Sequence, residues 1–62
     1  MRIEGHEVTH EANGAGCWLW IDGVLICGGA GTDAEMASRL YGEIERSGSL
    51  PAPVLLRLTA GY

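Results

Sequence analysis

The chain contains no lysine and no phenylalanine, and its four basic side chains are all arginines. Eight acidic residues outweigh them, which leaves a net charge of −4 at pH 7. This balance opposes binding to nucleic-acid backbones and to anionic membrane surfaces, because both are negatively charged themselves. We therefore expect no direct contact with nucleic acid or with membranes. An acidic chain suits protein partners whose surfaces are basic.

Long hydrophobic runs and cysteines are also scarce. No apolar run approaches the length that spans a membrane, and residues 1–7 lack the apolar core of a signal peptide. The two cysteines, Cys17 and Cys27, are too few for a disulfide framework. We interpret them as reduced and mostly buried thiols, which are typical of cytoplasmic proteins. The sequence therefore predicts a cytoplasmic location.

The chain is short, with 62 residues. A hydrophobic fraction of 47% argues against disorder and predicts a single folded domain over residues 1–62. A chain of this size buries only about 60% of the surface that its unfolded form exposes. Small domains therefore often need a staple, a metal or a partner subunit for stability.

The clearest structural signal is the pair Asp22-Gly23, which separates two apolar stretches within residues 17–27. Asp-Gly is typical of a two-residue hairpin turn, because both residues adopt positive φ there. Alternation along the strands then predicts one face formed by Trp18, Trp20, Leu25 and Cys27. The opposite face receives Leu19, Ile21, Val24 and Ile26. Cys17 points away from Cys27 in this register, so a bridge between them would need backbone movement.

Other segments are predicted as strands or turns. Residues 2–12 form a first strand, and residues 13–16 form a turn rich in residues that tolerate positive φ. Two prolines precede a last strand over residues 54–59, in which alternate apolar side chains face inward.

One helix is predicted after the glycine-rich residues 28–31. Thr32 serves as its N-cap with Glu35 at the capping-box spacing, and Gly48 ends it. Gly42 interrupts the helix, which suggests close packing at that position. The fold class is therefore α+β, with the order β-β-β-α-β and one helix packed on one face of a small, mostly antiparallel sheet.

We expect the helix to cover the face with the smaller side chains, that of Leu19 and Ile21. The face that carries Trp18 and Trp20 is then left to solvent, to another part of the fold or to a partner.

Residues 6–10 read His-Glu-Val-Thr-His and match the H-E-x-x-H signature of zinc proteases. That chemistry needs a helix, on which both histidines reach one zinc ion and the glutamate activates a bound water. Here Val8 and Thr9 are β-branched, so we predict a strand. On a strand His6 and His10 are about 13 Å apart at ~3.3 Å per residue, too far to share an ion. We predict no catalytic, cofactor or metal site, and a zinc hydrolase is only the third candidate function.

The remaining candidate site is a surface for a protein partner. It combines carboxylates with an aromatic patch and comprises Glu4, Glu7, Glu11, Trp18, Trp20 and Asp22. Tryptophan is enriched among the residues that dominate interface energetics, and carboxylates steer basic targets. Alternatively, both tryptophans complete the core and the carboxylates only keep the chain in solution.

These residues, with the stretch 18–21 on a short lysine-free scaffold, give the chain a resemblance to small inhibitors encoded by phages and mobile elements, notably anti-CRISPR proteins. The resemblance lies in the overall character of the chain and not in a motif. It implies a non-enzymatic inhibitor, active in the host cytoplasm, that blocks a basic, nucleic-acid-binding surface of a CRISPR effector complex. Its carboxylates would lie where phosphates otherwise bind.

A self-associating structural or accessory domain is the second candidate function. The tryptophan face would then form a homodimer interface that also relieves the thin core. Two-fold pairing is the commonest closed arrangement of identical subunits.

Overall fold

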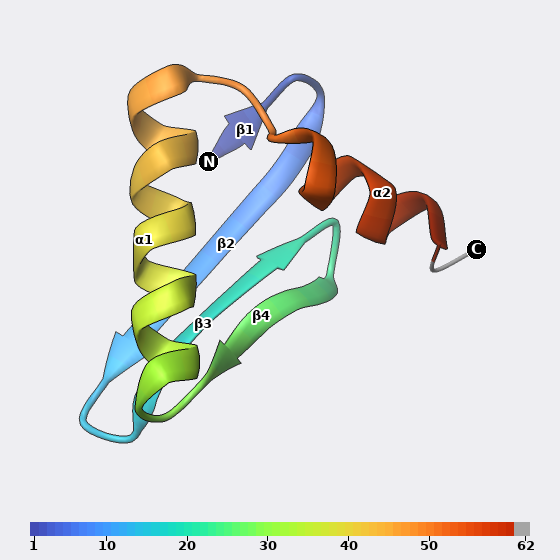
Figure 1. Cartoon of the computed structure of the whole chain (residues 1–62). Helices are drawn as coiled ribbons and strands as arrows, with labels where there is room; N and C mark the ends of the chain where they lie inside the picture. The colour runs from blue at the N-terminus through green and yellow to red at the C-terminus, as the bar shows by residue number, and fades with distance from the viewer. Residues whose placement is uncertain (61–62) are drawn as a thin grey trace.

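The computed structural model of the chain describes residues 1–60, which form one antiparallel sheet and two helices (Figure 1). The elements are β1 (Arg2–Ile3), β2 (His6–Asn13), β3 (Gly16–Ile21), β4 (Val24–Gly29), α1 (Thr32–Ser47) and α2 (Ala52–Ala60). The strands lie side by side in chain order, β1-β2-β3-β4. The predicted α+β class, with a helix packed on a small antiparallel sheet, is confirmed.

The predicted hairpin turn at Asp22-Gly23 is also confirmed. Ile21 pairs with Val24, so that Asp22 and Gly23 form a two-residue loop between β3 and β4. Their φ angles are 53° and 79°, both positive as a type I′ turn requires.

The single strand predicted over residues 2–12 is instead two strands joined by a tight turn. Glu4 and Gly5 have φ angles of 51° and 81°, and Ile3 pairs with His6 across them. Glycine adopts this conformation without steric cost, which allows the chain to fold back here. The turn brings Ile3 into the core, where its side chain is buried.

The pairing of β3 with β4 contains a β-bulge that the sequence analysis did not predict. Trp20 pairs with Leu25, but the next pair joins Leu19 to Cys27. Ile26 is therefore an extra residue in β4, and its side chain is buried. A bulge bends its strand, which allows successive residues of β4 to contact the same core.

This bulge corrects the predicted face of Cys27. Cys27 packs against the core rather than beside the tryptophans, and Gly28 lies opposite Trp18. Cys17 is buried on the core side as well. The two thiols therefore share one side of the sheet, and both are free.

Helix α1 lies across β3 and β4 on one face of the sheet, as predicted (Figure 1). Leu19 and Ile21 are fully buried beneath it, and α1 contributes the fully buried Ala37 and Ile44. Helix α2 contacts β4 and lines a groove with α1 on this same side. Among residues 1–60, no helix lies across the other face of the sheet, and only Leu25 of the edge strand β4 shares a hollow with Arg57 and Ala60 of α2.

The start of α1 differs from the prediction, whereas its end agrees with it. Gly31 rather than Thr32 is the N-cap, with φ 66°, and no side chain caps the helix. Because the chain enters the helix through this glycine conformation, Thr32 lies inside the helix and forms no capping box with Glu35. Gly48 adopts φ 68°, and its N–H donates to the carbonyl of Ile44 at 2.8 Å, as a C-cap should.

The strand predicted over residues 54–59 is wrong, because this segment forms helix α2. The carbonyl of Pro51 accepts hydrogen bonds from the N–H groups of Val54 and Leu55 at 3.0 and 3.2 Å. Pro53 lies in the first turn of α2, where the missing N–H of a proline would have no partner within the helix. Within α2 only Val54 and Leu58 are buried, four residues apart as on one helical face. No helix within residues 1–60 combines the length and hydropathy needed to cross a membrane.

Candidate protein-binding face

The uncovered side of the sheet gathers acidic and aromatic side chains from alternate strand positions. In the pairing of β2 with β3, Thr9 lies opposite Trp20 and Glu11 lies opposite Trp18. Residues at alternate positions share a face, because side chains of a strand point to opposite sides in turn. We call this surface the open face; its members are Arg2, Glu7, Thr9, Glu11, Trp18, Trp20 and Leu25.

The Trp18 side chain lies over two glycines on the open face, Gly28 opposite it on β4 and Gly16 two residues before it on β3. A β-carbon on Gly28 would lie 2.5 Å from Cδ1 of Trp18, and one on Gly16 would lie 3.2 Å from its Cη2. The indole therefore covers two glycines and is half-buried. A side chain that is already ordered loses little conformational entropy when a partner binds it. Trp18 is thus a preformed aromatic contact.

The open face carries more negative than positive charge. Arg2 Nη1 lies 3.9 Å from Glu7 Oε2, and both side chains are largely exposed. Exposed pairs of this kind contribute little, so Arg2 compensates Glu7 only weakly. Glu11 has no ion-pair partner within 4.0 Å among residues 1–60. Two carboxylates therefore face solvent beside the two indoles.

Asp22 lies outside the open face and has partners within the chain. Its Oδ1 accepts a hydrogen bond from the N–H of Glu7 at 2.9 Å, and its Oδ2 lies 2.6 Å from Nδ1 of His6. The hydrogen bond with His6, followed by the one from Glu7, holds the pKa of the Asp22 carboxyl below its usual value of 3.8. Asp22 ties the β3–β4 turn to β2.

Glu4 has a comparable role in the turn between β1 and β2. Its Oε1 accepts a hydrogen bond from the backbone N–H of Leu50 at 2.6 Å. This bond connects the first hairpin to the segment between the two helices. Of the predicted partner-binding residues, the structure thus brings together Glu7, Glu11, Trp18 and Trp20, while Glu4 and Asp22 brace turns.

The H-E-x-x-H segment lies in strand β2, as predicted. Its two histidines have separate partners, His6 at Asp22 and His10 at Cys17, where His10 Nε2 lies 3.1 Å from Sγ. No group of three or more potential metal ligands occurs among residues 1–60.

A cluster of His10, Cys17 and Tyr41 was missed by the sequence analysis. The rings of His10 and Tyr41 stack with centroids 4.1 Å apart and planes inclined by 7°. The only sequence signal is alternation, which places His10 and Cys17 on the core side of adjacent strands. Nearby, burial and then the proximity of Cys17 raise the pKa of the Cys27 thiol, which keeps it protonated and weakly nucleophilic at neutral pH.

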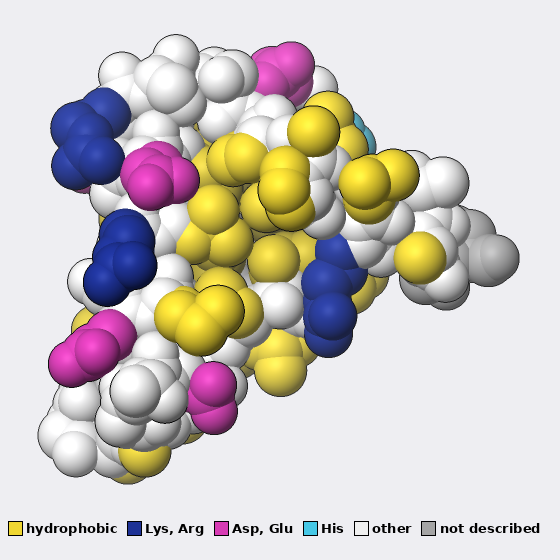
Figure 2. All heavy atoms as spheres, viewed as in Figure 1, with side chains coloured by type: hydrophobic (Ala, Val, Ile, Leu, Met, Phe, Trp, Pro, Cys, Tyr) yellow, Lys and Arg dark blue, Asp and Glu magenta, His cyan; other side chains and the backbone are white. Residues whose placement is uncertain are grey.

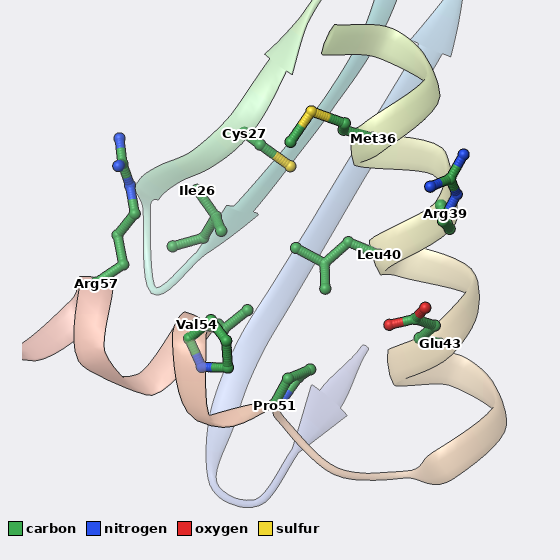
Figure 3. Close-up of a pocket in the computed structure, with 10 residues that line it drawn as sticks. Ile26, Cys27, Met36, Arg39, Leu40, Glu43, Pro51, Val54 and Arg57 are labelled. Carbon is green, nitrogen blue, oxygen red and sulfur yellow. The ribbon is translucent and has the colours of Figure 1, made fainter. Parts of the chain in front are cut away.

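A groove lies between α1, α2 and β4 that the sequence does not predict, because its pattern predicts a strand over residues 54–59. It has a volume of about 390 Å³ and is shown in Figure 3. Ile26 and Cys27 of β4 line it together with side chains of both helices. The spacing of Val54 and Leu58 was the one available signal for the second helix.

Comparisons with protein-family models, with curated proteins and with solved structures found no match. The functional interpretation therefore depends on the geometry of the two uncovered surfaces, the open face and the groove.

Proposed function

We propose that this chain is a non-enzymatic protein-binding module whose open face docks on a basic surface of another protein. The observation that carries the proposal is the placement of Glu7 and Glu11 beside Trp18 and Trp20 on a sheet face that no helix among residues 1–60 lies across. Ordered indoles supply apolar contact area, and the flanking carboxylates select cationic partners.

The carboxylates of the open face also favour one kind of basic partner surface, namely a surface that otherwise binds nucleic acid. Surfaces that bind nucleic acid present arginine and lysine to phosphates, and carboxylates can occupy the same positions. Occupation of such a surface would make the chain an inhibitor that competes with nucleic acid. The resemblance to small phage inhibitors narrows this proposal to a CRISPR effector complex as target, with the acidic balance and the small size of the chain in support.

A charge reversal tests the proposal. The double variant Glu7→Lys/Glu11→Lys is compared with Glu35→Lys/Glu45→Lys, which makes the same charge change at exposed positions of α1. Each tagged protein is used for affinity capture from host lysate, quantified by mass spectrometry, and the captured proteins are challenged with a DNA oligonucleotide.

We expect nucleic-acid-binding proteins to be retained by the wild type and by the α1 variant, lost by the open-face variant and released by DNA. Equal capture by both variants would contradict the role of the open-face carboxylates. Retention that DNA does not reverse would contradict competition with nucleic acid.

A further inference from the structure

Helix α2 carries apolar side chains that no other element among residues 1–60 covers. It contains a single charged residue, Arg57, among nine residues. Val54 and Leu58 are buried against the body of the protein, but Leu55 and Leu56 are 39% and 70% exposed. A helix that is apolar on all sides is normally surrounded by other elements. The exposed leucines of α2 therefore indicate a missing neighbour.

The groove beside α2 extends this uncovered apolar surface onto α1. Met36 and Leu40 of α1 face Val54 of α2 across a floor that includes Ile26 (Figure 3). In Figure 2 hydrophobic side chains fill the hollow between the two helices and continue over α2. Met36 is 57% exposed at the rim. Groove and helix thus form one continuous apolar surface.

Charged residues line both sides of the groove, Arg39 and Glu43 on α1 and Arg57 on α2. Glu43 extends from α1 and Arg57 from α2, on opposite sides of the groove (Figure 3). Arg39 precedes Glu43 by one helical turn, yet among residues 1–60 none of these three side chains has an ion-pair partner within 4.0 Å. A two-fold axis that exchanges the two sides of the groove would bring Arg57 of each copy to the α1 side of the other, where Glu43 lies one turn from Arg39.

From this self-complementary pattern we infer that a second copy of the chain covers α2 and the groove in a two-fold dimer. Leu56 and Met36 become buried in the contact, and Arg57 pairs with the partner's Glu43. An isologous contact needs one surface that fits itself, and this apolar groove carries Arg57 on one side and Glu43, one turn from Arg39, on the other. The open face lies on the other side of the sheet and stays accessible in both copies.

This dimer would also supply the subunit contact that small domains often need. This contact differs from the homodimer through the tryptophan face that the sequence predicts as an alternative, because it lies at α2 and the groove, where the surface is apolar. The inference does not depend on the proposed function, because it involves neither the carboxylates nor the indoles of the open face.

The first test uses Leu56→Asp with Thr9→Asp, an open-face substitution, as its control. Both positions are exposed, so both variants should fold, which circular dichroism checks. Light scattering after size-exclusion chromatography, over a wide range of concentrations, should give dimers for the wild type and Thr9→Asp. Leu56→Asp should raise the dissociation constant at least about tenfold, the loss expected at an interface hot spot.

A charge swap tests the pairing itself. Arg57→Glu and Glu43→Arg should each weaken the dimer, and the double variant should restore it, because each copy then presents the reversed pair. A wild type that is monomeric at all concentrations would overturn the inference and leave the groove to a different occupant. A dimer that Leu56→Asp leaves intact, or one that the double variant fails to restore, would overturn it as well.

Discussion

Because Gly28 has no side chain, the indole of Trp18 can lie against the sheet on the open face. The indole of Trp18 lies over this glycine, and a β-carbon there would approach Cδ1 of Trp18 at 2.5 Å and its Cα at 2.7 Å. At the second atom the obstacle is backbone, which cannot rotate away. Gly42, in the middle of α1, is the opposite case. The nearest atom that a β-carbon there would meet is Nη1 at the end of the flexible Arg46 side chain, at 3.7 Å. The close packing predicted at Gly42 is therefore not found.

These two glycines predict stability changes of opposite sign. Gly28→Ala should lower the free energy of unfolding by about 1–3 kcal/mol, because the added methyl group displaces Trp18 or its strand. Gly42→Ala should raise it by about 0.5–1 kcal/mol, because alanine restricts the unfolded chain and favours the helix. Urea unfolding of both variants measures these changes. A neutral Gly28→Ala would show that Trp18 does not rest on the sheet in this way.

Asp22 predicts a pH dependence with a definite sign. Its pKa is lowered in the folded protein by the hydrogen bonds from His6 and from the N–H of Glu7. A lowered pKa stabilises the fold at pH values above the unfolded value of 3.8, and this contribution is lost as pH falls through the folded pKa. The free energy of unfolding of the wild type should therefore decline more steeply below pH 3.8 than that of Asp22→Asn.

Asp22→Asn is a suitable control because Asn-Gly also favours the type I′ turn, so that the variant removes the charge and keeps the backbone conformation. The comparison requires urea unfolding at a series of pH values. Parallel profiles for the two proteins would show that Asp22 does not couple protonation to folding.

Among the elements, α2 shows where sequence periodicity is ambiguous. Val54, Leu56 and Leu58 recur at every second position, as on the inward face of a strand. Val54 and Leu58 are also four residues apart, as on one face of a helix. In the fold this segment is a helix, and its first turn closes through the hydrogen bonds from Val54 and Leu55 to the carbonyl of Pro51. The contact with β4 then buries Val54 and Leu58 rather than all alternate residues.

This arrangement predicts different costs for two neighbouring substitutions. Leu58 is 6% exposed, so Leu58→Ala should lower the free energy of unfolding by at least about 2 kcal/mol through lost burial and a cavity. Thr59 is exposed, and Thr59→Ala should change it by less than about 0.5 kcal/mol. Chemical denaturation measures both. Equal effects would contradict the helical placement of this segment.

Residues 1–60 present two uncovered surfaces, the open face on one side of the sheet and the groove with α2 on the other. The open face is acidic and aromatic, and the groove with α2 is apolar. A sheet with one helical layer cannot bury both of its faces, so a chain of this size keeps one of them available. With the groove occupied by a second copy, the two open faces would belong to one bivalent particle, and binding to a partner with two sites would be strengthened.

A dimer also makes stability depend on concentration, because association stabilises only the folded state. The unfolding midpoint of the wild type should rise with protein concentration, and that of Leu56→Asp should rise less over the same range. Thermal unfolding followed by circular dichroism at several concentrations provides the measurement. A wild-type midpoint independent of concentration would contradict association through α2.

Local sequence determined the Asp22-Gly23 hairpin, the body and C-cap of α1, and the alternation that puts Trp18 and Trp20 on one face of their strand. Each of these depends on neighbouring residues alone, through positive φ, helical spacing or the two-residue period of a strand. Tertiary structure decided the bulge at Ile26, the helical state of α2 and the roles of Glu4 and Asp22. These depend on contacts between residues distant in sequence, such as the bond from Leu50 to Glu4, which no local pattern encodes.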